Sequence, residues 1–186
     1  MRVSTFVKYA FALFVIVAII SAFPTAPSSD GYQVTDVVND INNNVSKLQL
    51  TVRDFTGGIF TAMKIYVRTG ALTKTIQGAV DTTQACGNFT SDESGNVAMA
   101  FLNLHPEVTE MMDVLIIKKE VFKRGLLFGL FPLTTIVRDR LTTQQGLAAQ
   151  LVQEVVQRLA ADFANVAPSL RETIARDFTR ALEAFA

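Results

Sequence analysis

Apolar residues recur at three- and four-residue steps along most of this chain. The clearest stripe consists of Val34, Val38, Ile41, Val45, Leu48, Val52 and Phe55. This spacing places the apolar side chains on one face of an α-helix and leaves Asp36, Asp40 and Lys47 on the solvated faces. The pattern predicts a long amphipathic helix that stops before Gly57 and Gly58, where a glycine in the left-handed conformation would end it.

A second helix is predicted by the stripe of Ile59, Met63, Tyr66, Leu72, Ile76 and Val80. Thr90 and Glu93 then have the spacing of a capping box, which predicts a third helix from about Ser91 to about Leu104. We expect Pro106 to open a separate helix after that, because proline fits a first helical turn but lacks the amide hydrogen that a helix interior uses.

The second half of the chain shows the same periodicity in three further stripes. They consist of Val108, Met111, Met112, Leu115, Ile116 and Phe122, of Leu133, Ile136, Val137, Leu147, Leu151, Val155 and Leu159, and of Leu170, Ile174, Phe178, Leu182 and Phe185. No alternating strand pattern is convincing. The sequence therefore predicts an all-α bundle of about five or six amphipathic helices without a disulfide.

The N-terminal segment differs from the rest. Two basic residues precede an apolar run from Tyr9 to Phe23, which predicts a secretory signal peptide over residues 1–22, cleaved after Ala22. The run is shorter than the roughly 18 residues of a spanning helix, so an uncleaved anchor is the weaker alternative. Residues 23–32 are rich in Pro, Ser and Gly and predict a flexible stub. Residues 33–186 then form the helical-bundle domain, and the protein is expected outside the cell.

Secretion changes how charge and single residues are interpreted. Without the signal peptide, 17 − 2 = 15 basic residues face 17 acidic ones, and a net charge of −2 argues against a nucleic-acid partner. Cys86 is the single cysteine, so it is either a small buried hydrophobe or a site of intermolecular pairing. Asn44 and Asn88 begin glycosylation sequons, and Asn88 is the better acceptor because it lies in a turn-rich stretch.

The sequence contains few residues in patterns typical of catalysis. His105 is the one histidine, and we expect a turn residue there because a proline follows it. The chain has no HExxH or GxSxG motif and no Cys/His pair at metal-ligand spacing. Gly57 and Gly58 lack the Lys-Ser/Thr that follows the glycines of a phosphate-binding loop. We therefore expect no enzyme, no metal and no cofactor.

Two features point beyond a plain bundle. The first is a set of long or aromatic apolar residues expected on the inner faces: Phe55, Phe60, Met63, Met111, Met112, Phe122, Phe128, Phe131 and Phe178. Methionine adapts to irregular apolar surfaces, which suits a cavity for a flexible ligand, although a solid core is the commoner explanation.

The second feature is a basic cluster directly before an apolar run. Lys118, Lys119, Lys123 and Arg124 precede the sequence LLFGLF, which has no polar side chain. If exposed, this run would adsorb to a lipid or waxy surface. If buried, it is a kinked and fully packed helix junction. The adsorption candidates are Leu126, Leu127, Phe128 and Phe131.

The order of several short motifs resembles the fungal hydrophobic surface binding protein A family, which includes secreted cell-wall galactomannoproteins. The matching motifs are Phe55-Thr-Gly-Gly58, Leu104-x-Pro106-x-Val108, Lys118-Lys119 followed by Phe122, and Ala184-Phe185. The resemblance covers roughly residues 36–186. It implies a secreted, non-catalytic helical bundle that binds long-chain fatty acids in a cavity, or adsorbs to hydrophobic surfaces and helps a secreted hydrolase to reach them.

The helical pattern supplies candidates for such a cavity. They are Leu48, Val52, Phe55, Met63, Tyr66, Met111, Leu115, Phe122, Ile136, Leu151 and Phe178. Because a carboxylate cannot be buried unpaired, the Tyr66 hydroxyl, Lys118 or Lys119 is expected to meet a fatty-acid headgroup. The alternative is a structural or antigenic cell-wall mannoprotein with a solid core and no small-molecule ligand.

Overall fold

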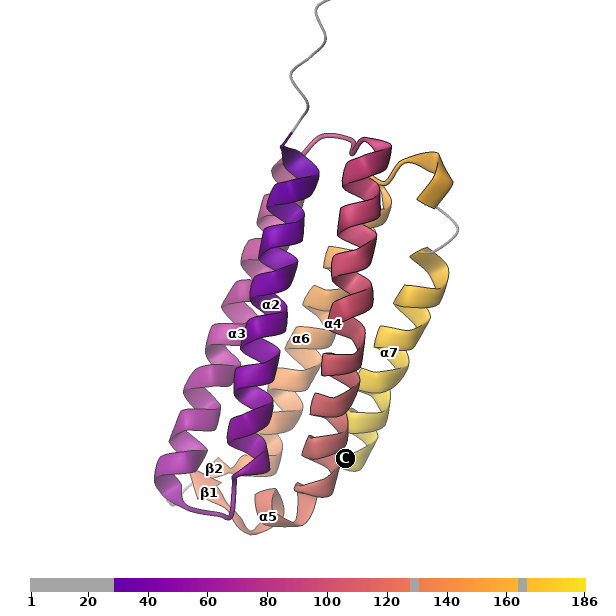
Figure 1. Ribbon diagram of the computed structural model, residues 1–186. Helices are drawn as coiled ribbons and strands as arrows, with labels where there is room; N and C mark the ends of the chain where they lie inside the picture. The colour runs from indigo at the N-terminus through magenta and orange to yellow at the C-terminus, as the bar shows by residue number, and fades with distance from the viewer. Residues whose placement is uncertain (1–28, 128–130, 164–166) are drawn as a thin grey trace, which may run out of the picture.

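Five long helices form a ring around one apolar core (Figure 1). They are α2 (Asp30–Arg53), α3 (Ile59–Ala85), α4 (Ser91–Ile117), α6 (Leu133–Val156) and α7 (Ala167–Ala184). The structure is a computed structural model that describes residues 29–127, 131–163 and 167–186. Neighbours around the ring follow the order α3, α2, α4, α7 and α6, and α6 packs on α3 to close it. The predicted all-α bundle is confirmed, and the ring arrangement determines where its interior lies.

Short elements close one end of the ring. They are the helix α5 (Lys119–Arg124) and the strands β1 (Leu126–Leu127) and β2 (Phe131–Pro132), while the 3-10 helix η1 (Ala161–Phe163) precedes α7. In the hairpin, Leu126 lies opposite Pro132 and Leu127 opposite Phe131 in antiparallel register. The hydrophobic pattern did not predict this hairpin, because two-residue strands are too short to show an alternating pattern.

The apolar stripe predicted for the first helix is fully buried. Val34, Val38 and Val52 have no exposed surface, and the other members of the stripe are at most 4% exposed. The helix begins at Asp30, inside the segment expected to be a flexible stub. The reason is a close approach at Gly31, whose N–H donates to Glu93 Oε1 at 3.2 Å. A Cβ at Gly31 would lie 2.3 Å from the Cβ of Glu93, so only glycine fits there.

The capping box at the start of α4 is confirmed. Thr90 Oγ1 accepts the Glu93 N–H at 3.3 Å, and Glu93 Oε2 accepts the Thr90 N–H at 2.9 Å. The expected break at Pro106 is wrong, because α4 continues through it to Ile117. Pro106 and Leu102 are both exposed, so water can reach the Leu102 carbonyl that proline leaves without its helical donor. Packing along both sides of α4 then maintains one helix.

The adjacent glycines separate two helices. Gly57 has a φ of 110°, which L side chains rarely adopt, whereas Gly58 is the residue before α3 with an ordinary φ of −74°. The prediction that a glycine of this pair caps the first helix is wrong, because α2 ends at Arg53 with Asp54 in a right-handed conformation as its C-cap, and the glycines lie in the loop that follows. No helix of the described ranges combines the length and hydropathy needed to cross a membrane.

Candidate functional site

Two apolar chambers lie inside the helix ring. The hairpin chamber, between α2, α3, α4 and α6 near the hairpin, includes Val52, Ile65, Phe122 and Ile136 in its wall. The central chamber lies further from the hairpin and is also covered by α7; its wall includes Ile41, Ile76, Leu104, Leu151 and Phe178. Their volumes are about 30 Å³ and about 60 Å³, counted as the space open to the centre of a water molecule.

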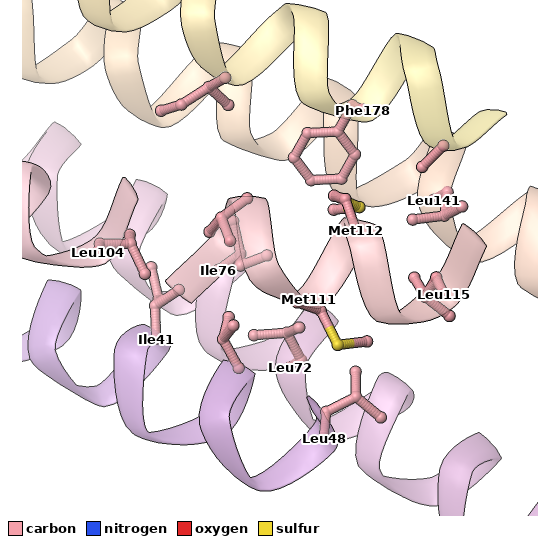
Figure 2. Packing of buried hydrophobic residues seen from close by; sticks show 14 of the residues in the cluster. Ile41, Leu48, Leu72, Ile76, Leu104, Met111, Met112, Leu115, Leu141 and Phe178 are labelled. Atoms are coloured by element: carbon pink, nitrogen blue, oxygen red, sulfur yellow. The ribbon is translucent and has the colours of Figure 1, made fainter. Parts of the chain in front are cut away.

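The chambers share part of their walls. Leu48, Met111, Leu115, Leu141 and Gln144 line both of them. Figure 2 shows Met111 beside Leu48, and its thioether is therefore one of the groups that stand between the two spaces. Small rotations of such unbranched side chains would join the chambers into one elongated cavity.

The central chamber is a poor site for water. Gln144 is the one polar side chain among its described lining residues, and a buried water needs two to four polar partners. Apolar cavities of this kind stay dry, and the atoms that line them lose dispersion contacts. An apolar ligand would restore those contacts without displacing bound water.

Most of the cavity candidates named from the sequence line these chambers. Those placed in a wall are Leu48, Val52, Tyr66, Met111, Leu115, Phe122, Ile136, Leu151 and Phe178. Phe55 and Met63 are not in either lining. The ring of Phe55 instead packs on Phe122 with centroids 4.9 Å apart, and Phe122 meets Phe185 at 5.9 Å. These three rings form an aromatic plug at the hairpin end.

Sequence reasoning missed several wall residues on α6, among them Arg140, Leu141 and Gln144. Leu141 follows Val137 by four residues, so the helical period itself could have found it. Gln144 is buried and donates to the Thr69 carbonyl at 3.3 Å and to Thr73 Oγ1 at 3.2 Å. Neither polar residue could have been assigned to a cavity wall from an apolar stripe.

Of the three residues expected to bind a carboxylate headgroup, only Tyr66 is in the described lining of a chamber. The Tyr66 ring lines the hairpin chamber and is 38% exposed. The Arg140 guanidinium carbon lies 5.3 Å from the centre of that ring, in a cation–π contact. The Lys118 ammonium donates to the Phe55 carbonyl at 3.1 Å, and neither Lys118 nor Lys119 is in the described lining of either chamber.

The adsorption candidates lie at the hairpin end. Leu126 and Leu127 form β1 and Phe131 begins β2, but their side chains, like the whole of Phe128, lie outside the described residues. Phe60, expected on an inner face, is 90% exposed, so that expectation is wrong. It lies in the first turn of α3, before the apolar stripe of that helix reaches the core. Ile59 beside it is 48% exposed.

His105 lies in the middle of α4 and not in a turn. Its Nε2 is 3.7 Å from Oδ2 of the buried Asp177, and the Thr109 hydroxyl donates to the same oxygen at 2.6 Å. This cluster joins α4 to α7, and the Arg180–Asp113 ion pair at 2.6 Å joins them again. Across the described ranges, no group of three or more His, Cys, Asp or Glu side chains could hold a metal ion.

Cys86 and the two sequons occupy different environments. Cys86 is half-buried, its thiol donates to the Thr82 carbonyl at 3.1 Å, and burial together with the nearby Asp30 carboxylate raises its pKa. Asn88 is exposed in the loop between α3 and α4. Asn44 is half-buried within α2, where its amide donates to Thr75 Oγ1 at 3.2 Å. The geometry favours Asn88 as the accessible acceptor.

A comparison with models of protein families identifies the family of this chain. The model of hydrophobic surface binding protein A matches residues 31–157, which span α2 to α6. The chain belongs to this family. The matched segment carries the whole wall of the hairpin chamber, whereas the α7 residues over the central chamber lie beyond it. No curated protein sequence matches the chain.

Solved structures with a similar fold contain fatty acids. The crystal structure of Afmp4p in complex with palmitic acid is 18% identical, with a TM-score of 0.77 over 84% of this chain and 99% of that one. Ligand binding domain 1 of the Penicillium marneffei MP1 protein, complexed with arachidonic acids, is 18% identical, with a TM-score of 0.74 over 85% and 98%. Domain 2, complexed with multiple arachidonic acids, is 21% identical, with a TM-score of 0.74 over 88% and 99%. At 18–21% identity, this similarity shows that the chain has the same fold as these domains.

Proposed function

We propose that this family member is a non-catalytic protein that holds a long-chain fatty acid between its helices. The observation that carries the proposal is the pair of largely apolar chambers with a shared wall. The palmitic and arachidonic acids in the similarly folded Afmp4p and MP1 domains support it. The fatty-acid tail would occupy both chambers and replace the dispersion contacts that their walls now lack.

The chambers must widen to accept such a ligand. A cavity of about 150 Å³ binds benzene, so a chain of sixteen carbons needs a larger space than the two present volumes supply. Met111 and Met112 have flexible side chains that can repack without rotamer strain, and Figure 2 shows them on opposite sides of α4. We expect their movement, together with small helix shifts, to open the cavity on binding.

The energetics permit binding of moderate strength. Burying a sixteen-carbon chain at about 0.8 kcal/mol per methylene gives roughly 12 kcal/mol. Association costs on the order of 4–15 kcal/mol, and widening the chambers adds to that cost. We therefore expect dissociation constants near micromolar and not picomolar.

Native mass spectrometry of the delipidated protein titrated with palmitic acid tests the proposal. Saturable addition of one or two ligands is the expected result. The competing function is a structural or antigenic cell-wall protein, which the small volumes of the closed chambers favour. A protein that retains no fatty acid at any concentration would support that competing function.

Adsorption to hydrophobic surfaces is a second proposed function, as the family description suggests. Phe60 and Ile59 are exposed where α3 approaches β1, so the hairpin candidates and these two residues would form one apolar end of the bundle. Replacing Phe60 by serine should reduce adsorption to hydrophobic particles, whereas Met99→Ser, at an exposed residue of α4, should not. Phe128→Ser with Phe131→Ser tests the hairpin in the same way.

The proposed function also requires that the protein leaves the cell. We propose cleavage after Ala22, glycosylation at Asn88 and residence in the medium or cell wall, where adsorption helps a secreted hydrolase to reach hydrophobic surfaces. The intact mass of the protein from a fungal culture medium, before and after enzymatic deglycosylation, tests the first two. A mass that includes residues 1–22 would contradict cleavage. Esterase assays of the purified protein test the absence of catalysis.

A further inference from the structure

Arg140 is the cationic residue of the chamber walls. It lies on α6, is half-buried and lines the hairpin chamber. No other lysine or arginine is found in either lining within the described part of the chain. A guanidinium at the edge of an otherwise apolar space is costly to desolvate unless it meets an anion.

The described residues offer Arg140 no carboxylate partner, unlike Arg53, Arg158 and Arg180. Arg53 pairs with Glu110 at 2.6 Å, and Arg158 pairs with Glu154 at 2.8 Å. Arg140 instead lies over the face of the Tyr66 ring. Stacking on a ring occupies the face of the guanidinium and leaves its N–H edges free, and those edges bind a carboxylate with two parallel hydrogen bonds.

The position of Arg140 matches one end of a long apolar path. From Arg140 the walls continue through Leu141 and Met111 into the central chamber, where Val152 lies on the same helix. The twelve-residue step from Arg140 to Val152 spans about 18 Å along α6. Half of a bilayer's hydrocarbon core, one lipid chain deep, is about 15 Å thick. A long-chain acid therefore fits with its headgroup at Arg140 and its tail in both chambers.

We propose that Arg140, held against Tyr66, binds the carboxylate of the ligand and makes the site selective for unesterified fatty acids. The proposal rests on the proposed function, because it assigns the headgroup end of the same cavity. An ester or an alcohol with the same tail would fill the chambers equally well. It would leave the guanidinium without a charged partner, and so would bind more weakly.

Isothermal titration of the delipidated protein with palmitic acid and with methyl palmitate tests this assignment. Wild-type protein should bind the acid roughly ten-fold or more tightly, since hydrogen bonds between charged groups contribute that much to affinity. Arg140→Gln should abolish this preference, because it should lower the affinity for palmitic acid and leave the affinity for methyl palmitate unchanged. Arg140→Lys, which keeps the charge but not the fork of donors, should retain part of it.

Arg138→Gln is the matched control. It removes the same charge from an exposed position of α6, outside both chambers, and should leave both affinities unchanged. If both Arg140 variants lost affinity for the acid and the ester equally, the assignment would be overturned, because a purely structural role would affect the binding of both ligands. Unchanged acid affinity in Arg140→Gln would also overturn it. Failure of the wild-type protein to bind either ligand would instead refute the proposed function itself.

Discussion

Leu141→Ala enlarges the proposed cavity from within. Leu141 is 3% exposed and lines both chambers, and Figure 2 shows it to the right of Met112. Truncation of a core leucine to alanine costs about 2–5 kcal/mol in unfolding free energy. Part of the Leu141 side chain already faces empty space and has fewer contacts to lose. We therefore expect a loss near the lower end, about 2–3 kcal/mol, in the protein without lipid.

The same substitution should cost less when the cavity is filled. Urea unfolding followed by circular dichroism, with and without saturating palmitic acid, measures both differences. A bound tail can occupy the space left by the leucine, so the lipid should stabilise Leu141→Ala more than it stabilises the wild type. We expect the destabilisation to fall by about 1 kcal/mol or more when lipid is present.

Val155→Ala is the control on the same helix. Val155 is 4% exposed but is not in the described lining of either chamber. Its destabilisation should be equal with and without palmitic acid. The reasoning would be refuted if Leu141→Ala behaved like this control, because the tail would then not lie beside Leu141.

Three further predictions concern local structure. Gly57→Ala should lower the unfolding free energy by about 1–2 kcal/mol, because Gly57 has a positive φ. Gly58→Ala is the control: a Cβ added there meets open space, so the unfolding free energy should change by no more than about 0.5 kcal/mol. Thermal or urea unfolding measures both. Thr90→Ala should cost about 1 kcal/mol by removing the cap of α4, and an unchanged urea midpoint would contradict that role. Because burial raises the pKa of Cys86, its alkylation by iodoacetamide should accelerate at higher pH than that of a free cysteine peptide; a coincident pH profile would show an exposed thiol.

The helices could be predicted because each buries one face. The stripe from Val34 to Phe55 has the helical period and is buried throughout. The capping box of Thr90 and Glu93 is a local signal with local partners, and it placed the start of α4 correctly. Pro106 misled because its effect on a helix depends on packing and solvent access, which do not appear in local sequence.

The cavity could be predicted only in part. Met111 and Phe178 followed from apolar stripes, but a stripe does not distinguish a wall residue from one in solid packing, such as Phe55. Phe60 continued an apolar run and was assigned inward, although it precedes the point where α3 enters the core. Arg140 depends on the pairing of α6 with α3, a long-range contact that the sequence pattern does not specify.

The methionine methyl groups provide the most direct test of lipid binding inside the bundle. Met111 lines both chambers and Met112 lines the central one, whereas Met99 on the same helix is 56% exposed. Carbon-13 methyl NMR of the delipidated protein, titrated with palmitic acid, reports on all three at once. We predict saturable shifts at Met111 and Met112 and none at Met99. Saturable binding that leaves both buried methyl groups unshifted would contradict a ligand held between the helices.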